Sequence, residues 1–254
     1  MAIIDLSRIT RTYHNLQARR IEVMRRRIQA QSKAIAFGHV IPDPADLPIG
    51  RGRRIEAAVL FLDISGFTSR PSNTQDEQEN NVRVLSLFFS EVIRVIQDYG
   101  GTVEKNTGDG VMAYFSRRSG GGDPRHRALA CAITVFHAGD QFVNPIVLAS
   151  EIMPLSYRIC VDFGWITIAR MGAAQRFNHI VAVGTAANRT SKMLGFAHGG
   201  EIMIGGDVLA GLPPEWIRAY VKLATTETGW MYPDGTAYPF FLFNGRWVLP
   251  AQQK

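Results

Sequence analysis

Two aspartates that are far apart in the chain, Asp63 and Asp109, stand where a carboxylate could do chemistry. Asp63 follows a continuous apolar run at residues 57–62, the pattern of a strand buried on both faces. Asp109 lies between two glycines in a predicted hairpin turn. If these strands are neighbours, both carboxylates meet at one sheet edge, and Mg²⁺ typically binds one or two carboxylates together with phosphate oxygens. The alternatives are a helix cap for Asp63 and an ordinary turn residue for Asp109.

The sequence around both aspartates resembles the metal-binding motifs of class III adenylyl and guanylyl cyclases. Residues 61–68 read FLDISGFT and residues 105–110 read KNTGDG, and one long amphipathic helix pattern separates them, as in that family. The resemblance implies that Asp63 and Asp109 hold two divalent ions, Mg²⁺ or Mn²⁺, with the Ile64 carbonyl as a further ligand.

The same resemblance implies a phosphate site at Gly66, Phe67 and Thr68. These residues would open a helix whose free backbone N–H groups cradle the triphosphate, because the start of a helix offers unpaired donors. Pro71 departs from the family pattern. We therefore expect a short phosphate-binding turn.

A third motif, GTAANRTSKM at residues 184–193, resembles the family's helix that carries a transition-state Asn and Arg four residues apart. Asn188 matches the Asn, which positions the ribose in the family, and Lys192 stands in place of the Arg. Residues four apart share one face of a helix. Lys192 keeps a positive charge for the α-phosphate but lacks the planar fork of Arg. The alternative is an Asn and a Lys on a solvated helix face.

Base recognition is where the sequence differs most from the purine cyclases. Lys105 matches their base-reading Lys, but Val181 stands where they carry Asp or Thr, and it can neither donate nor accept a hydrogen bond. His179, Asn178 and Arg176 could supply polar contacts instead. The chain resembles the bacterial pyrimidine cyclases of Pycsar anti-phage defence in three features. These are Val181 at the purine-selecting position, the motif of residues 184–193, and a single domain behind a short N-terminal helix.

That resemblance implies synthesis of cyclic UMP or cyclic CMP, with UTP favoured over CTP, and a separate effector that responds to the product. The wider family implies a head-to-tail homodimer, in which one chain supplies the metal aspartates and the other supplies Lys105, Asn188 and Lys192. Two other functions stay open. One is an adenylyl cyclase with an unusual base pocket, and the other is an inactive cyclase-like module that binds nucleotides or a partner.

The elements that would position these residues follow from apolar periodicity and from turn residues. Helices are expected at about residues 76–99, 124–143 and 185–196. Strands are expected at 57–62, 102–107, 111–115, 179–183, 201–204, 217–223 and 240–243, with two more around Gly164 within 156–169. The leading elements run strand, helix, strand, strand, helix, strand. This is the βαββαβ unit of ferredoxin-like folds, an α+β class.

The first 50 residues are expected to stand apart from a catalytic domain at residues 51–254. They show an amphipathic helix pattern at about 5–33, followed by a linker rich in Pro and Gly. Residues 1–54 hold 11 Lys+Arg against 4 Asp+Glu, so the basic excess lies there. A solvated helix face is the favoured explanation. Binding to nucleic acid or to an anionic membrane is the alternative, and no interleaved aromatics or recognition helix support it.

The composition is that of an ordinary globular protein, with 46% hydrophobic and 20% charged residues. No run approaches the roughly 18 to 20 uncharged apolar residues of a membrane span, and the start of the chain lacks a signal-peptide core. Cys131 and Cys160 have no metal-ligand spacing and are expected in the core. We therefore expect a cytoplasmic protein with no membrane span.

Overall fold

The computed structural model describes residues 50–106, 108–117, 122–174, 177–225 and 227–247, together with residues 35–38, Arg19, Val23 and Leu47. Side chains are described at these positions except at 35–37, 105–106 and 171–180. Except for Arg19 and Val23, the helix expected at 5–33 lies outside this part of the chain, as does most of the linker. Among the described helices, none combines the length and the apolar character that a membrane span requires.

Four strands and two helices form the central unit in the predicted order. They are β2 (Gly52–Ile64), α2 (Gln75–Asp98), β3 (Thr102–Asn106), β4 (Gly110–Ser116), α3 (Pro124–Ala138) and β5 (Tyr157–Ala174). The strands lie in the order β3-β4-β2-β5, and each neighbouring pair is antiparallel. This is the ferredoxin-like βαββαβ arrangement, so the predicted fold class is confirmed.

Further strands widen this sheet. β7 (Ile202–Gly205) pairs parallel with β5, and β9 (Phe240–Phe243) and β8 (Val221–Thr225) continue beyond it. β6 (Phe177–Val183) pairs with the second half of β5, and β1 (Ile35–Phe37) pairs parallel with the start of β2. The described residues thus form a nine-stranded sheet.

Capping residues explain where the two large helices begin. Thr74 and Glu77 form a capping box at α2, in which the Thr74 hydroxyl accepts from the Glu77 N–H and the Glu77 carboxylate accepts from the Thr74 N–H. Asp123 caps α3 by accepting from the Arg125 N–H. Pro124 occupies the first turn of α3, where a missing N–H breaks no helical hydrogen bond.

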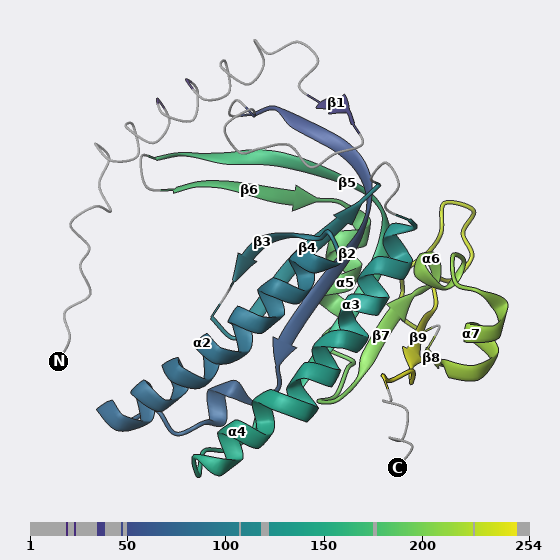
Figure 1. The fold of residues 1–254 in the computed structure, drawn as a ribbon. Helices are drawn as coiled ribbons and strands as arrows, with labels where there is room; N and C mark the ends of the chain where they lie inside the picture. The colour runs from purple at the N-terminus through teal and green to yellow at the C-terminus, as the bar shows by residue number, and fades with distance from the viewer. Residues whose placement is uncertain are drawn as a thin grey trace.

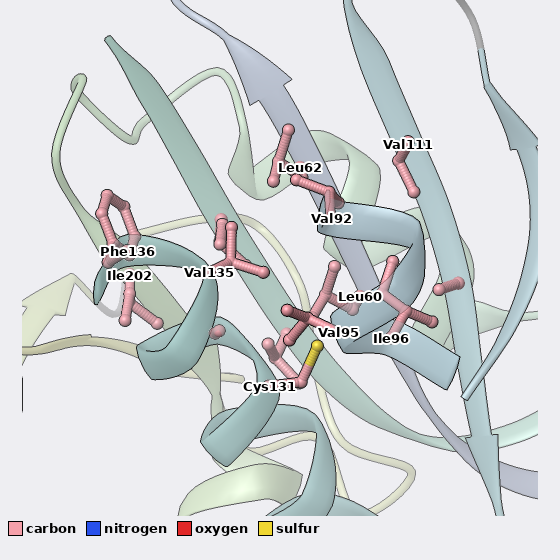
Figure 2. Close-up of a cluster of buried hydrophobic side chains, with 14 of the residues drawn as sticks. Leu60, Leu62, Val92, Val95, Ile96, Val111, Cys131, Val135, Phe136 and Ile202 are labelled. Carbon is pink, nitrogen blue, oxygen red and sulfur yellow. The ribbon is translucent and has the colours of Figure 1, made fainter. Parts of the chain in front are cut away.

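The two faces of the sheet are covered differently (Figure 1). α2 and α3 lie side by side over one face, and the main core, with Leu60 and Leu62 of β2, fills the space between them and the sheet (Figure 2). On the other face α5 (Thr185–Met193) covers alternate β2 residues such as Val59. Because side chains alternate along a strand, Asp63 belongs to the α5 face.

Several element predictions were wrong in part. Residues 157–169 belong to one strand, because Gly164 (φ 155°) stays paired with Ala57 and β5 continues to Ala174. Residues 214–220 form helix α7 (Pro214–Tyr220), so the strand expected at 217–223 starts only at Val221. The helix expected at 124–143 is α3 followed by a π-helical turn (Gly139–Val143) and α4 (Asn144–Ala149). The helix expected at 185–196 ends at Met193.

Both cysteines are buried and free, as predicted. Burial raises the pKa of the Cys131 and Cys160 thiols. A protonated thiol is a poor nucleophile and a poor metal ligand. Cys131 and Cys160 are therefore packing residues.

Candidate active site

Asp63 and Asp109 lie together at one edge of the sheet. Asp63 is near the end of β2, and its partner on β4 is Gly110, the residue after Asp109. The Ile64 N–H donates a 2.9 Å hydrogen bond to the Asp109 carbonyl oxygen. The antiparallel register thus brings two aspartates from distant parts of the chain to one place, which is the arrangement expected from the sequence.

An arginine that the sequence did not single out binds the Asp63 carboxylate. Arg158 is the register partner of Asp63 on β5, and its Nε and Nη2 atoms lie 3.0 and 2.7 Å from Asp63 Oδ2. Its Nη1 atom donates a 2.9 Å hydrogen bond to the Ala197 carbonyl. Asp63 Oδ1 accepts no hydrogen bond from any described residue. Nothing in the local sequence marks Arg158, because only the pairing of β2 with β5 places it there.

The oxygens at this edge fit the hard ligands that Mg²⁺ and Mn²⁺ require. The Asp63 side chain is 24% exposed, and the Asp109 carboxylate makes no hydrogen bond or ion pair with a described residue. No cluster of three or more His, Cys, Asp or Glu side chains that could hold a metal occurs within the described ranges. Two carboxylates with open positions suit ions whose remaining ligands come from a phosphate group.

The predicted phosphate turn is smaller than a helix start. Phe67–Ser69 form a single 3₁₀ turn (η2), and α2 begins only at Gln75, so Gly66, Phe67 and Thr68 do not open the long helix. Gly66 adopts a left-handed conformation (φ 68°), which glycine tolerates best. The N–H groups of Gly66, Phe67 and Thr68 have no acceptor among the described residues, and such donors suit phosphate oxygens.

A buried arginine next to this turn forms hydrogen bonds with α2 and with the segment before β5. Arg70 is 7% exposed, and its Nε atom donates to Asn81 of α2 at 3.2 Å. Its Nη2 and Nη1 atoms donate to the carbonyls of Met153 and Pro154 at 2.6 and 3.2 Å. The Ser65 hydroxyl, next to the turn, is buried without a partner in the described part of the chain. An orphan polar group of this kind is common where a ligand or water binds.

Asn188 and Lys192 are exposed on α5, away from the sheet. The start of α5 packs near Gly164, where a Cβ atom would lie 3.5 Å from the Ala186 side chain. Gly164 pairs with Ala57, and six residues of β2 between Ala57 and Asp63 span about 20 Å. One chain therefore holds the first turn of α5 far from its own carboxylate pair.

The residues predicted to bind the base lie on β3 and β6. Lys105 is part of β3, and Val181 is a half-buried residue of β6. The Ala182 N–H donates a 3.3 Å hydrogen bond to Glu104 Oε2, so the two strands meet beside these positions. The side chains of Lys105 and His179 are outside the described part of the structure, and their role in base binding stays a prediction.

Comparison with known proteins identifies similar sequences. Residues 52–227 match the family model described as the Adenylate and Guanylate cyclase catalytic domain. An uncharacterized protein of Mycobacterium tuberculosis (strain CDC 1551 / Oshkosh) is 30% identical over 192 residues, which cover 74% of this chain and 32% of that protein. The uridylate cyclase of Rhodovulum sp. (strain MB263) is 24% identical over 164 residues, covering 61% of this chain and 65% of that enzyme. The chain thus spans about a third of the first relative.

A solved structure supports the architecture. The crystal structure of the guanylyl cyclase Cya2 matches with a TM-score of 0.65 and 23% sequence identity. The match covers 79% of this chain and 97% of that one. At this identity the likeness concerns the fold.

Proposed function

This chain belongs to the adenylate and guanylate cyclase catalytic domain family, and we propose that it converts a nucleoside triphosphate to a 3′,5′-cyclic monophosphate and pyrophosphate. The observation that carries the proposal is the meeting of Asp63 and Asp109 at one sheet edge, near a turn whose N–H groups lack acceptors among the described residues. Carboxylates for divalent ions beside donors for phosphate suit phosphoryl transfer, which depends on positioning and charge neutralisation.

Asp63, Asp109 and the Ile64 carbonyl would hold two divalent ions, Mg²⁺ or Mn²⁺. Bound there, such ions neutralise phosphate charge and lower the pKa of the attacking ribose hydroxyl. Asp63 must first release Arg158. The side chains of that pair are 27% and 24% exposed, so the ions must replace Arg158 at Asp63, and phosphate oxygens must replace Asp63 at the guanidinium. The released guanidinium remains close enough to bind phosphate oxygens.

The remaining steps belong to side chains and backbone groups of the protein. The ribose 3′-oxygen bonds to the α-phosphorus and gives its proton to water, while the bond to the bridging oxygen breaks and pyrophosphate leaves. The N–H groups of Gly66, Phe67 and Thr68 bind the leaving phosphates. Asn188 orients the ribose, and Lys192 places a positive charge at the α-phosphate. Because an ammonium lacks a rigid fork, Lys192 contributes charge more than orientation.

Two copies of the chain would share each active site. The start of α5 lies about 20 Å from Asp63 along the sheet, and Asn188 in its first turn is exposed, so a partner's α5 would bring this group to the carboxylates. A head-to-tail dimer would complete two sites, each with the carboxylates of one chain and the α5 side chains of the other.

A pyrimidine triphosphate is the proposed substrate, with UTP favoured over CTP. Two observations support this choice: Val181 offers no hydrogen bond to a purine edge, and a relative at 24% identity is a uridylate cyclase. In this proposal the cyclic nucleotide is a second messenger in anti-phage defence and acts on a separate effector. That part rests on the resemblance to Pycsar cyclases.

The test is to incubate the purified full chain with Mn²⁺ and each of the four labelled nucleoside triphosphates in turn. Cyclic UMP as the main product supports the proposal, and cyclic CMP would support a pyrimidine cyclase with the other base. Dominant cyclic AMP would make the chain an adenylyl cyclase. No cyclic product from any triphosphate, or unchanged turnover in Asp109→Ala, would overturn the catalytic proposal.

A further inference from the structure

A charged cluster is buried beneath α5, in the middle of the fold. Asp162 of β5 is fully buried, and its Oδ2 atom accepts a 2.7 Å hydrogen bond from Arg189 Nε. Its Oδ1 atom accepts from the Tyr238 hydroxyl at 2.6 Å and from the Phe163 N–H at 2.8 Å. Arg189 also donates to Asp207 Oδ2 at 2.8 Å, from its Nη2 atom.

The surrounding chain is shaped to enclose this cluster. The Arg189 guanidinium lies 3.5 Å from the centre of the Tyr238 ring, and the Tyr238 hydroxyl also accepts from the Asp207 N–H. A Cβ atom at Gly205 would approach within 2.3 Å of Asp162 Oδ1 and 2.8 Å of the Tyr238 hydroxyl. Only glycine leaves room for these groups at this point of β7.

Stability alone is a weak explanation for such a cluster. Desolvation of a buried ion pair often offsets its attraction, and a well-packed apolar replacement is commonly as stable or more so. Burial raises the pKa of Asp162 to about 6 even with Arg189 beside it, which shows how poorly the site solvates charge. A role in fixing geometry is therefore the more useful explanation to test.

The element that the cluster fixes is α5, the helix of Asn188 and Lys192. Arg189 directly follows Asn188, and adjacent helical residues point about 100° apart, so an inward Arg189 sets the outward direction of Asn188. α5 has nine residues and no side-chain N-cap. Its start buries the small residues Ala186 and Ala187, which offer little resistance to sliding or rotation.

We propose that Arg189 is a positioning residue, which fixes the rotation and height of α5 on the sheet so that Asn188 and Lys192 reach the nucleotide held by the partner's carboxylates. This inference rests on the proposed function. Arg189 connects α5 to three other segments, namely β5 through Asp162, the start of α6 (Gly206–Leu209) through Asp207, and the segment before β9 through Tyr238. A small displacement of α5 would misplace both active groups, and misplacement of about 1 Å can lower turnover about 100-fold.

The test uses the double variant Arg189→Met with Asp162→Asn in the full-length chain. Methionine keeps much of the length of arginine, and the amide oxygen of the introduced asparagine can still accept from Tyr238 and Phe163, so no charge of the Asp162–Arg189 pair is left buried alone. We expect a melting temperature near that of the wild type, kcat lower by about 100-fold, and KM for the triphosphate nearly unchanged. A purely structural role would change the melting temperature and leave kcat unaltered below it.

A second variant keeps the inference testable if the double variant does not fold. Arg189→Lys retains the charge but cannot bind Asp162 and Asp207 through one rigid fork, so kcat should fall by about tenfold at constant KM. The matched control is Val135→Ala, a core change in α3 on the opposite face, which should lower the melting temperature without changing kcat.

The outcomes separate this inference from the proposed function. Suppose that the wild type forms cyclic nucleotide and that Asn188→Ala lowers kcat. If both Arg189 variants then keep the kcat of the wild type, the positioning role is overturned and the proposed function stands. If the wild type forms no cyclic nucleotide, the proposed function fails and the positioning role fails with it. If kcat falls in the Arg189 variants as it does in Asn188→Ala, the positioning role is supported.

Discussion

The Asp63 carboxylate binds Arg158 in the structure, and the proposed divalent ions would compete with Arg158 for it. In the structure Arg158 occupies its Oδ2 atom, whereas Oδ1 has no donor among the described residues. The proposed catalytic state needs both carboxylates on divalent ions. The aspartates could be predicted from the sequence because a carboxylate after an apolar run, and another inside a glycine turn, stand out locally. Arg158 could not, because its position depends on the register between β2 and β5.

Asp162 gives a prediction about pH. Its pKa is raised to about 6 from an ordinary value of 3.8, chiefly by burial. Folding therefore favours the protonated form, and the stability that this group contributes is present below about pH 4 and is lost as pH rises through about 6. Between pH 4 and pH 7 the unfolding free energy of the wild type should fall by about 2.4 kcal/mol relative to Asp162→Asn.

Denaturant titrations of both proteins at the two pH values measure this difference. Comparing the two proteins removes the contribution of other carboxyl groups, such as Asp123, whose pKa is lowered in the folded state. A difference in unfolding free energy that does not change with pH would show that Asp162 does not titrate in this range.

At the scale of elements, local signals predicted most of the central unit. The apolar periodicity of α2, the apolar run of β2 and the glycine turn before β4 each act over short stretches, so their elements could be placed from the sequence. The prediction of two strands around Gly164 was wrong. Glycine often ends a strand, but here Gly164 pairs with β2 and the strand continues past it. The turn at Phe67–Ser69 is short, as Pro71 led us to expect, but it does not open the long helix, which begins at Gln75.

The Arg70 contacts predict how this turn contributes to substrate binding. Arg70→Met would remove three hydrogen bonds that hold the segment after the turn to α2 and to residues 153–154. We expect KM for the triphosphate to rise by about tenfold with a smaller change in kcat, because the N–H groups of the turn bind ground state and transition state alike. Steady-state kinetics measure both constants.

The control for Arg70 is Arg83→Met, which changes an exposed arginine of α2 that pairs only with Glu79 in the described structure. It should leave KM and kcat unaltered. Equal effects of the two substitutions would indicate that the change reflects lost positive charge and not a released turn.

At the scale of the whole molecule, the separation of the start of α5, with Asn188, from the carboxylates has the most consequence. The motifs could be predicted as a set from the sequence, but a motif does not say whether its members meet within one chain. The structure keeps the start of α5 about 20 Å from Asp63, as the pairing of Gly164 with Ala57 requires. The proposed dimer would bring Asn188 of one chain to the carboxylates of the other.

Complementation tests the shared site. Asp109→Asn and Asn188→Ala should each be inactive alone, because each damages both sites of its own dimer. Mixed in equal amounts, with subunits free to exchange, half of the dimers are heterodimers and each has one intact site, so activity should return to about a quarter of the wild-type value. No recovery, with exchange confirmed by mass spectrometry, would place each site within one chain.

The most direct test of the central claim is a Mn²⁺ titration of the wild type and Asp109→Asn by calorimetry, with a saturating 3′-deoxy nucleoside triphosphate that cannot cyclise. Asp98→Asn, an exposed change at the end of α2, is the control. We predict two ions per active site in the wild type and in Asp98→Asn, and at most one, bound more weakly, in Asp109→Asn. Equal stoichiometry and affinity in all three proteins would contradict a metal site at the edge where Asp63 and Asp109 meet.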